Sequence, residues 1–154
     1  MQRIGLISDT HGLLRPEALA ALRGCDHLIH AGDIGKPEIL TELARLAPLT
    51  AVRGNNDTAP WVAELPEQTW LELDGVRIYV LHDLAELTPD GPAGAARVVV
   101  SGHSHRPQVV LRDGLLLVNP GSAGPRRFKL PVSVGELWLA AGGVSAHIRP
   151  LLLA

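Results

Sequence analysis

Short apolar runs alternate with helix-like segments through the first third of the chain. Three runs that end in polar residues or glycine are typical of buried strands: 3–8, 27–30 and 49–53. Between them, the chain predicts one helix from Pro16 to about Gly24 and another from Pro37, because proline suits the first helical turn. This order of strand, helix, strand, helix and strand predicts a parallel sheet, and such sheets bind ligands beyond the carboxyl ends of their strands.

After residue 68 the pattern changes to pairs of strands joined by tight turns. Asp-Gly at 74–75 and at 113–114, each between apolar runs, predicts two hairpins, and a third is predicted over 136–148 with its turn near Gly142-Gly143. The run 98–101 predicts one more strand, whereas 85–96 is rich in proline and glycine and predicts mostly loop with one helical turn. No linker or repeat divides the chain, so we expect one α/β domain over residues 1–154.

Composition narrows the class of protein. The chain has 154 residues, of which 46% are apolar and 19% charged, which excludes disorder and allows a sizeable core. A net charge of −2 and only 3% aromatic residues provide neither a basic arm nor a stacking platform, so we expect no extended nucleic-acid surface. The start of the chain lacks a signal peptide and no apolar run could span a membrane, which favours a cytoplasmic protein without membrane partners. The single cysteine, Cys25, excludes an internal disulfide and predicts an inert buried thiol.

Polar residues with metal-binding chemistry follow five of the predicted strands: Asp9, His11, Asp33, Asn55, His82, His103 and His105. Each alone is more often a hydrogen-bonded turn, although two imidazoles in His103-Ser104-His105 point the same way on an extended segment and favour a metal. Because the ends of parallel strands meet at one edge of a sheet, we expect these side chains to converge.

Other polar residues have weaker interpretations. His30 is close enough to Asp33 to support it, whereas His27 and His147 are expected to be ordinary residues. The stretch 119–122, Asn-Pro-Gly-Ser, is expected to shape a loop near the site, either as a plain turn or by direct substrate contact. Two alternatives, phosphate contact and solvated surface, stay open for three arginines: Arg53, Arg126 and Arg127.

The ordered set Asp9-x-His11, Gly32-Asp33, Gly54-Asn55-x-Asp57, His82 and Gly102-His103-Ser104-His105 resembles the calcineurin-like metallophosphoesterase superfamily. The compact size and the stretch 119–122 are similar to its small prokaryotic phosphodiesterase branch. The resemblance implies a four-layer αββα sandwich with mixed sheets and a dinuclear metal site at the carboxyl ends of the strands. It implies that Asp33 bridges two ions. The other ligands would divide into two shells, Asp9, His11 and His105 around one ion and Asn55, His82 and His103 around the other.

The resemblance also implies a function. A shell of nitrogen and oxygen donors suits manganese, iron, zinc, nickel or cobalt, and we expect two divalent ions with manganese as the first choice. The implied enzyme is a phosphodiesterase that hydrolyses a small or nucleotide-like phosphodiester with a metal-bridging hydroxide. Two alternatives remain, a phosphomonoesterase at the same site and a non-catalytic metal-binding scaffold for protein interactions; a homo-oligomer is left open. The presence of all seven candidate ligands favours the enzyme.

The chain departs from the family pattern in two places. The superfamily often has histidine after the asparagine ligand, as a proton donor oriented by the following acid, and the small branch often has cysteine; here Asn56 and Asp57 take these catalytic positions. An amide can donate a hydrogen bond but supplies no proton at neutral pH, so we expect a preference for good leaving groups. The second departure is Asp83-Leu84 after His82, where the branch usually has Gly-His.

Overall fold

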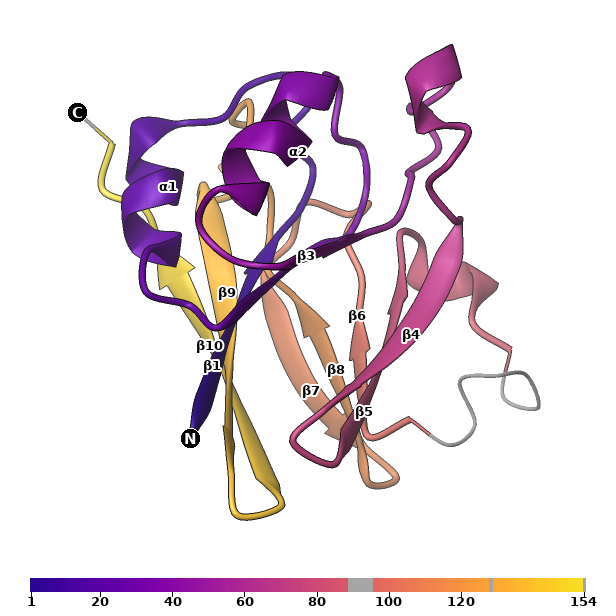
Figure 1. Cartoon of the computed structure of the whole chain (residues 1–154), viewed down its shortest axis with the longest axis vertical. Coiled ribbons are helices and arrows are strands. Elements are labelled where there is room, and N and C mark those ends of the chain that lie inside the picture. Colours follow the sequence, from indigo (N-terminus) through magenta and orange to yellow (C-terminus); the bar gives the residue numbers. More distant parts are fainter. Residues whose placement is uncertain (89–95, 128, 154) are drawn as a thin grey trace.

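The computed structural model describes residues 1–88, 96–127 and 129–153, and two five-stranded sheets face each other in it (Figure 1). The first sheet has the order β10-β9-β1-β2-β3, and its strands are β1 (Gln2–Ile7), β2 (His27–His30), β3 (Leu49–Ala51), β9 (Ser133–Ala140) and β10 (Gly143–Pro150). The second has the order β4-β5-β6-β8-β7, and its strands are β4 (Gln68–Leu73), β5 (Val76–Leu81), β6 (Val98–Val100), β7 (Gln108–Arg112) and β8 (Leu115–Asn119). Both sheets are mixed, as predicted, since each combines parallel and antiparallel pairs.

Two α-helices cover the outer face of the first sheet (Figure 1). They are α1 (Pro16–Leu22) and α2 (Pro37–Ala44), and both begin at the predicted prolines. Neither has a side-chain N-cap, so their stability comes mainly from packing of residues such as Leu22 and Leu43 on the sheet. Cys25 is buried in the same cluster, as predicted.

The outer face of the second sheet has a thinner cover in the described residues. A short 3-10 turn, η2 (Leu84–Glu86), packs Leu84 near Tyr79 and Val99 of the sheet. The predicted sandwich therefore has two α-helices on one side and a 3-10 turn on the other, and residues 89–95 of the predicted loop lie outside the described residues. A second 3-10 turn, η1 (Pro60–Val62), lies between β3 and β4.

The three predicted hairpins are present, joining β4 to β5, β7 to β8 and β9 to β10. Asp74-Gly75 and Asp113-Gly114 have positive φ at both residues, as a tight twisted hairpin turn requires. The third turn is Ala141-Gly142, one residue earlier than predicted, again with positive φ at both positions. Alanine carries no turn signal, which explains the shift.

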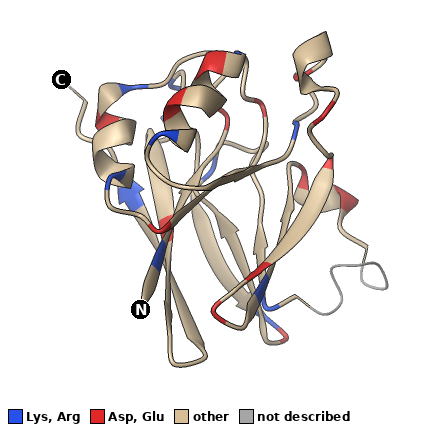
Figure 2. Cartoon of the chain, in the orientation of Figure 1, with Lys and Arg blue, Asp and Glu red and all other residues tan. Residues whose placement is uncertain are grey.

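The main core lies between the sheets, where β1, β2, β5, β6 and β9 contribute fully buried side chains such as Leu6, Ile29, Val80 and Val100. β1 runs parallel to β2 and β3 in one sheet, and β5, β6 and β8 are parallel in the other. Acidic and basic residues are interspersed over both sheets, whereas the charged residues within α1 and α2 are acidic (Figure 2). Among the described residues, no helix has the length and apolar content that a membrane span requires.

Candidate metal centre

Three predicted histidine ligands converge on one buried oxygen of a fourth, Asp9, at the carboxyl ends of β1, β5 and β6. The Asp9 Oδ1 atom lies 3.4 Å from His105 Nε2, 3.7 Å from His82 Nε2 and 3.8 Å from His11 Nε2. The Nε2 atoms of His11 and His105 are 3.3 Å apart. Donor atoms of Asp9, His11 and His105 are thus close enough to share a metal ion.

Asp33 lies where a bridging carboxylate would be needed. Its Oδ2 atom is 3.2 Å from His82 Nε2 and 3.7 Å from His11 Nε2, so it faces one histidine of each predicted shell. Two groups of side chains have donor atoms within 4.8 Å of one another, Asp9 with His11 and His105, and Asp9 with Asp33 and His82. Asp9 is common to both groups, so the distances place Asp9 between the two sets of donors. The family resemblance assigns this shared position to Asp33.

Asn55 and His103 lie at the open rim of this cluster. Asn55 Oδ1 is 3.2 Å from His103 Nδ1, and the His103 ring is 5.2 Å from that of His82. The His103 side chain is 46% exposed, and its Nε2 atom is 3.9 Å from a carboxylate oxygen of Asp83. The structure therefore brings all seven predicted ligands to one region, five of them tightly and two at its edge.

The backbone at the ligands has an unusual conformation. Five of the seven residues have φ between +46° and +71°: Asp9, His11, Asp33, His103 and His105. L-residues rarely adopt this left-handed region, which costs about 1 kcal/mol or more per residue and occurs at tight turns and at functional sites. The cost indicates that the ligand geometry is maintained at the expense of stability.

Glycines next to the ligands allow close packing around the carboxylates. A Cβ atom at Gly54 would lie 2.2 Å from Asp33 Oδ1, and one at Gly102 would lie 2.0 Å from Ser8 Oγ and 2.7 Å from Asp9 Oδ2. Any side chain at either position would displace a ligand. The repeated glycine before Asn55 and before His103 thus has a steric reason.

Buried polar atoms without a hydrogen-bond partner indicate that these side chains fit a metal ion. Asp9 Oδ1, His82 Nε2 and His105 Nδ1 are buried without a hydrogen-bond partner among the described residues. Leaving a buried polar atom unpaired costs about 1–3 kcal/mol, and folded proteins rarely do so. The first two atoms are 3.7 Å apart, and all the donors are nitrogen or oxygen. A divalent cation would satisfy both atoms.

The two buried carboxylates, Asp9 and Asp33, have pKa values shifted in opposite directions. Burial raises the pKa of Asp9. Burial also acts to raise the pKa of Asp33, but the close contact with His82 and a hydrogen bond from the Asn56 backbone lower it to about 2. Burial acts to lower the pKa of His82, yet its contacts with Asp33 and Asp9 raise it overall. Protons and metal ions would thus compete for His82.

The neighbours of the ligands fix their orientation. His82 Nδ1 lies 2.7 Å from the Ala31 carbonyl oxygen, which can only accept, so the proton is on Nδ1 and the Nε2 lone pair faces the centre in the neutral ring. Asp57 is buried, and its carboxylate accepts hydrogen bonds from the backbone N–H groups of Ile34, Gly35 and Gly54. Asp57 therefore ties together the loops that carry Asp33 and Asn55, which makes it a positioning residue here.

Asn56, the predicted catalytic amide, is anchored to Asp33. Its backbone N–H donates to Asp33 Oδ1 at 2.9 Å and its Nδ2 donates to Asp33 Oδ2 at 3.1 Å. One N–H of the amide is therefore engaged, which leaves the other to face a substrate.

His30 takes part in a chain of hydrogen bonds next to the candidate metal centre. It is fully buried, and its Nδ1 atom accepts from the Gly32 N–H at 3.1 Å, so the proton is on Nε2. Nε2 donates to Thr10 Oγ1 at 3.0 Å, and that hydroxyl donates to the Ile34 carbonyl oxygen at 2.8 Å. This chain of bonds connects the loop of Asp9 and His11 with the loop of Asp33.

We expect His30 to make stability fall in acid. Burial lowers the pKa of His30 to about 3, whereas an unfolded histidine has a pKa of about 6.5. Below about pH 6.5 the unfolded chain therefore binds a proton that the folded chain does not, and stability falls as the pH is lowered, by up to about 1.4 kcal/mol per pH unit. Urea unfolding of metal-free protein between pH 7.5 and 5 measures this slope, which should be shallower in His30→Gln.

The matched control is His147→Gln, because His147 is exposed on β10 and bonds only locally to Ser145. This variant should keep the wild-type slope. Parallel pH profiles for wild type and His30→Gln would contradict the assignment of a buried neutral imidazole at His30.

Several other residues hold the loops of the candidate ligands, among them the stretch 119–122 that the sequence predicts to shape a loop near the site, whereas Ser8 was not singled out. Asn119 donates from Nδ2 to the Gly102 carbonyl oxygen at 2.9 Å and to Ser104 Oγ at 3.1 Å. Ser122 donates to the Asp9 carbonyl oxygen, and Ser8 donates to Asp9 Oδ2. The stretch 119–122 is thus a brace between two ligand loops. The signal in the sequence was a polar residue directly at the end of an apolar strand.

Other candidates have ordinary contacts. Arg53 forms an ion pair with Glu67 at 3.4 Å, and His27 bonds to Thr50 Oγ1. Arg126 and Arg127 are exposed. His27 and His147 are therefore ordinary residues, as predicted.

The fold and site together define an α/β protein that gathers histidines and carboxylates for a divalent metal at the ends of two mixed sheets. The chain belongs to the calcineurin-like phosphoesterase superfamily, whose domain matches residues 2–140. It is 38% identical over 131 residues to a probable metallophosphoesterase of Methanothermobacter thermautotrophicus, covering 77% of this chain and 76% of that protein.

Solved structures share the fold. An archaeal phosphodiesterase superimposes with a TM-score of 0.77 at 23% identity, over 96% of this chain and 99% of that one. The Vps29 protein of Chaetomium thermophilum gives a TM-score of 0.77 at 18% identity, over 97% and 95% of the two chains. At these identities the likeness establishes the architecture alone.

Proposed function

We propose that this phosphoesterase is a phosphodiesterase that hydrolyses a small or nucleotide-like phosphodiester with two divalent metal ions, manganese being the expected metal. The observation that carries the proposal is the buried, unpaired Asp9 Oδ1 atom within 3.8 Å of three histidine nitrogens. A protein of Methanocaldococcus jannaschii that is 28% identical to this chain over 138 residues is named a phosphodiesterase, which supports the choice of a diester.

The residues would be divided between the two ions as follows. Asp9, His11 and His105 would hold one ion, and Asn55, His82 and His103 the other, with Asp33 shared. When bound, two such ions lower the pKa of a water molecule and stabilise charge on the phosphoryl oxygens.

The chain supplies the orientation of this site. Ser8, Asn119 and Asp57 hold the loops of the ligands in place through hydrogen bonds, so the donors need little rearrangement when ions bind. Asn56 can direct its second amide N–H toward the leaving oxygen but has no proton to give. Water would then protonate the leaving group, which favours esters with good leaving groups.

A phosphoester panel tests the proposal. Protein stripped with EDTA is supplied with manganese, iron, zinc, nickel or cobalt in turn, and turnover of bis(p-nitrophenyl) phosphate is compared with that of p-nitrophenyl phosphate. We expect metal-dependent hydrolysis with the diester preferred in kcat/KM. A preference for the monoester would indicate a phosphomonoesterase. Absence of turnover with every metal would contradict an enzyme and favour a binding scaffold.

A further inference from the structure

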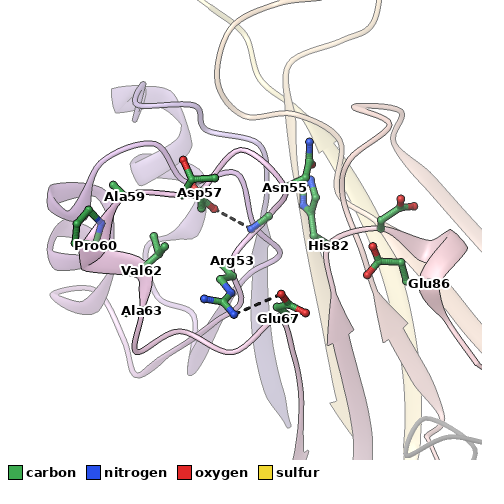
Figure 3. A pocket seen from close by; sticks show the side chains of 13 residues that line it. Arg53, Asn55, Asp57, Ala59, Pro60, Val62, Ala63, Glu67, His82 and Glu86 are labelled. Carbon is green, nitrogen blue, oxygen red and sulfur yellow. Dashed lines mark hydrogen bonds and ion pairs between the residues drawn. The ribbon is translucent and has the colours of Figure 1, made fainter.

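A cavity of about 650 Å³ opens beside the metal centre, and the metal chemistry does not account for it (Figure 3). Asn55 and His82 lie in its wall, so a molecule in the cavity would be next to the second predicted metal shell. Pockets for small organic ligands have volumes of about 300–1,000 Å³. A phosphoryl group at the centre would not need this space, but an organic group attached to it would.

One wall of the cavity is apolar. It is formed at η1 by Ala59, Pro60, Val62 and Ala63, which Figure 3 shows together on one side of the cavity. Proline and valine there offer carbon atoms and no side-chain hydrogen-bonding group. This wall suits the flat or branched carbon face of an organic group.

The opposite wall is acidic. Glu86 of η2 lies across the cavity from η1 (Figure 3). Acidic positions of η2 are red in Figure 2. Glu86 has no ion-pair partner among the described residues. Asp83 accepts from the Ala85 N–H and is 3.9 Å from His103 Nε2. Glu67 is compensated by Arg53. The cavity therefore has an excess of negative charge facing its apolar wall.

We propose that this cavity is the subsite for one organic group of the phosphodiester, and that it selects an uncharged or cationic group with an apolar face over an anionic group. The apolar face would pack on Pro60 and Ala63, and a positive charge would face Glu86 and Asp83. A group with a carboxylate or a further phosphate would be rejected by these two carboxylates. The inference rests on the proposed phosphodiesterase activity and names its substrate class.

The test uses four p-nitrophenyl phosphodiesters with the same leaving group and different second alcohols. The alcohols are methanol, choline, its neutral isostere 3,3-dimethylbutanol, and a straight-chain alcohol of similar size that ends in a carboxylate. We expect kcat/KM to be highest for the choline ester and lowest for the carboxylate ester, with a difference of about tenfold or more at low salt.

Two variants assign the effect to the cavity. Glu86→Lys should reduce the preference for the choline ester over the carboxylate ester by about tenfold, because it reverses the charge on the acidic wall. Glu72→Lys is the matched control, since Glu72 is exposed on β4 and lies outside the cavity lining, and it should leave the ratio unchanged. Ala59→Trp should lower kcat/KM for the dimethylbutyl ester relative to the methyl ester, because the indole would fill the cavity.

The outcomes separate this inference from the proposed function. Equal kcat/KM for the charged esters, preference for the carboxylate ester, or a ratio unaffected by Glu86→Lys would overturn the subsite, while metal-dependent turnover of the methyl ester would leave the phosphodiesterase in place. No turnover of any of the four esters with any metal would overturn both.

Discussion

Replacing Asp33 by alanine is expected to lower kcat/KM for a phosphodiester by at least about 1,000-fold, since loss of metal stabilisation costs several kcal/mol in the transition state. Asp33 is the carboxylate that faces a histidine of each predicted shell, and its pKa of about 2 keeps it ionised at neutral pH. Steady-state kinetics with manganese, together with the metal content after dialysis, measure the effect. Both should fall in Asp33→Ala.

The chain offers a matched control for the backbone at this position. Asp113 also has a left-handed conformation, with φ of +52° against +57° at Asp33. It lies in an exposed hairpin turn that is remote from the candidate ligands. Asp113→Ala therefore introduces alanine into the same strained region and should keep full turnover and metal content. An active, metal-replete Asp33→Ala would contradict the role given to Asp33.

Introducing a proton donor by Asn56→His is expected to speed the cleavage of diesters with poor leaving groups by about 100-fold, the usual scale of general acid catalysis. Asn56 is anchored beside Asp33, and its amide carries no acidic proton. Esters with good leaving groups need no protonation and should change little. The slope of log kcat/KM against leaving-group pKa over a series of aryl and alkyl diesters measures the difference, and it should become shallower.

Asn56→Gln is the control for Asn56→His, because it also alters the side chain without adding an acid. Its slope should stay as steep as that of the wild type. If Asn56→His shows the same slope as Asn56→Gln, then position 56 does not face the leaving group and the acid has been misplaced.

Much of the fold could be predicted from local signals. Proline at the start of both helices and Asp-Gly at two hairpin turns act through the backbone conformation of a few neighbouring residues, so they can be recognised without the tertiary structure. The turn at Ala141-Gly142 could not be placed correctly, because its first residue adopts positive φ only under the constraint of the flanking strands. The presence of only a 3-10 turn on the outer face of the second sheet, among the described residues, was also not predicted, because the composition of a loop does not determine which face of a sheet it covers.

The convergence of the candidate ligands could be predicted because their chemistry is local and follows strand ends. The hydrogen bonds that hold the loops of these candidate ligands could not be predicted. Asn119 bonds to Gly102 over 17 positions and Ser122 bonds to Asp9 over 113 positions, so these contacts exist only once the sheets have formed. The role of Asp57 is similar, because its carboxylate holds backbone N–H groups of a loop 22 to 23 positions away. The steric need for Gly54 and Gly102 also depends on side chains from other strands.

Anomalous diffraction from a crystal grown with manganese tests the central claim most directly. The account predicts two peaks about 3.5–4 Å apart. One would lie among Asp9, His11 and His105 and the other among Asn55, His82 and His103, with an oxygen of Asp33 between them. A centre without anomalous density at saturating manganese, or with the metal bound elsewhere on the chain, would contradict it.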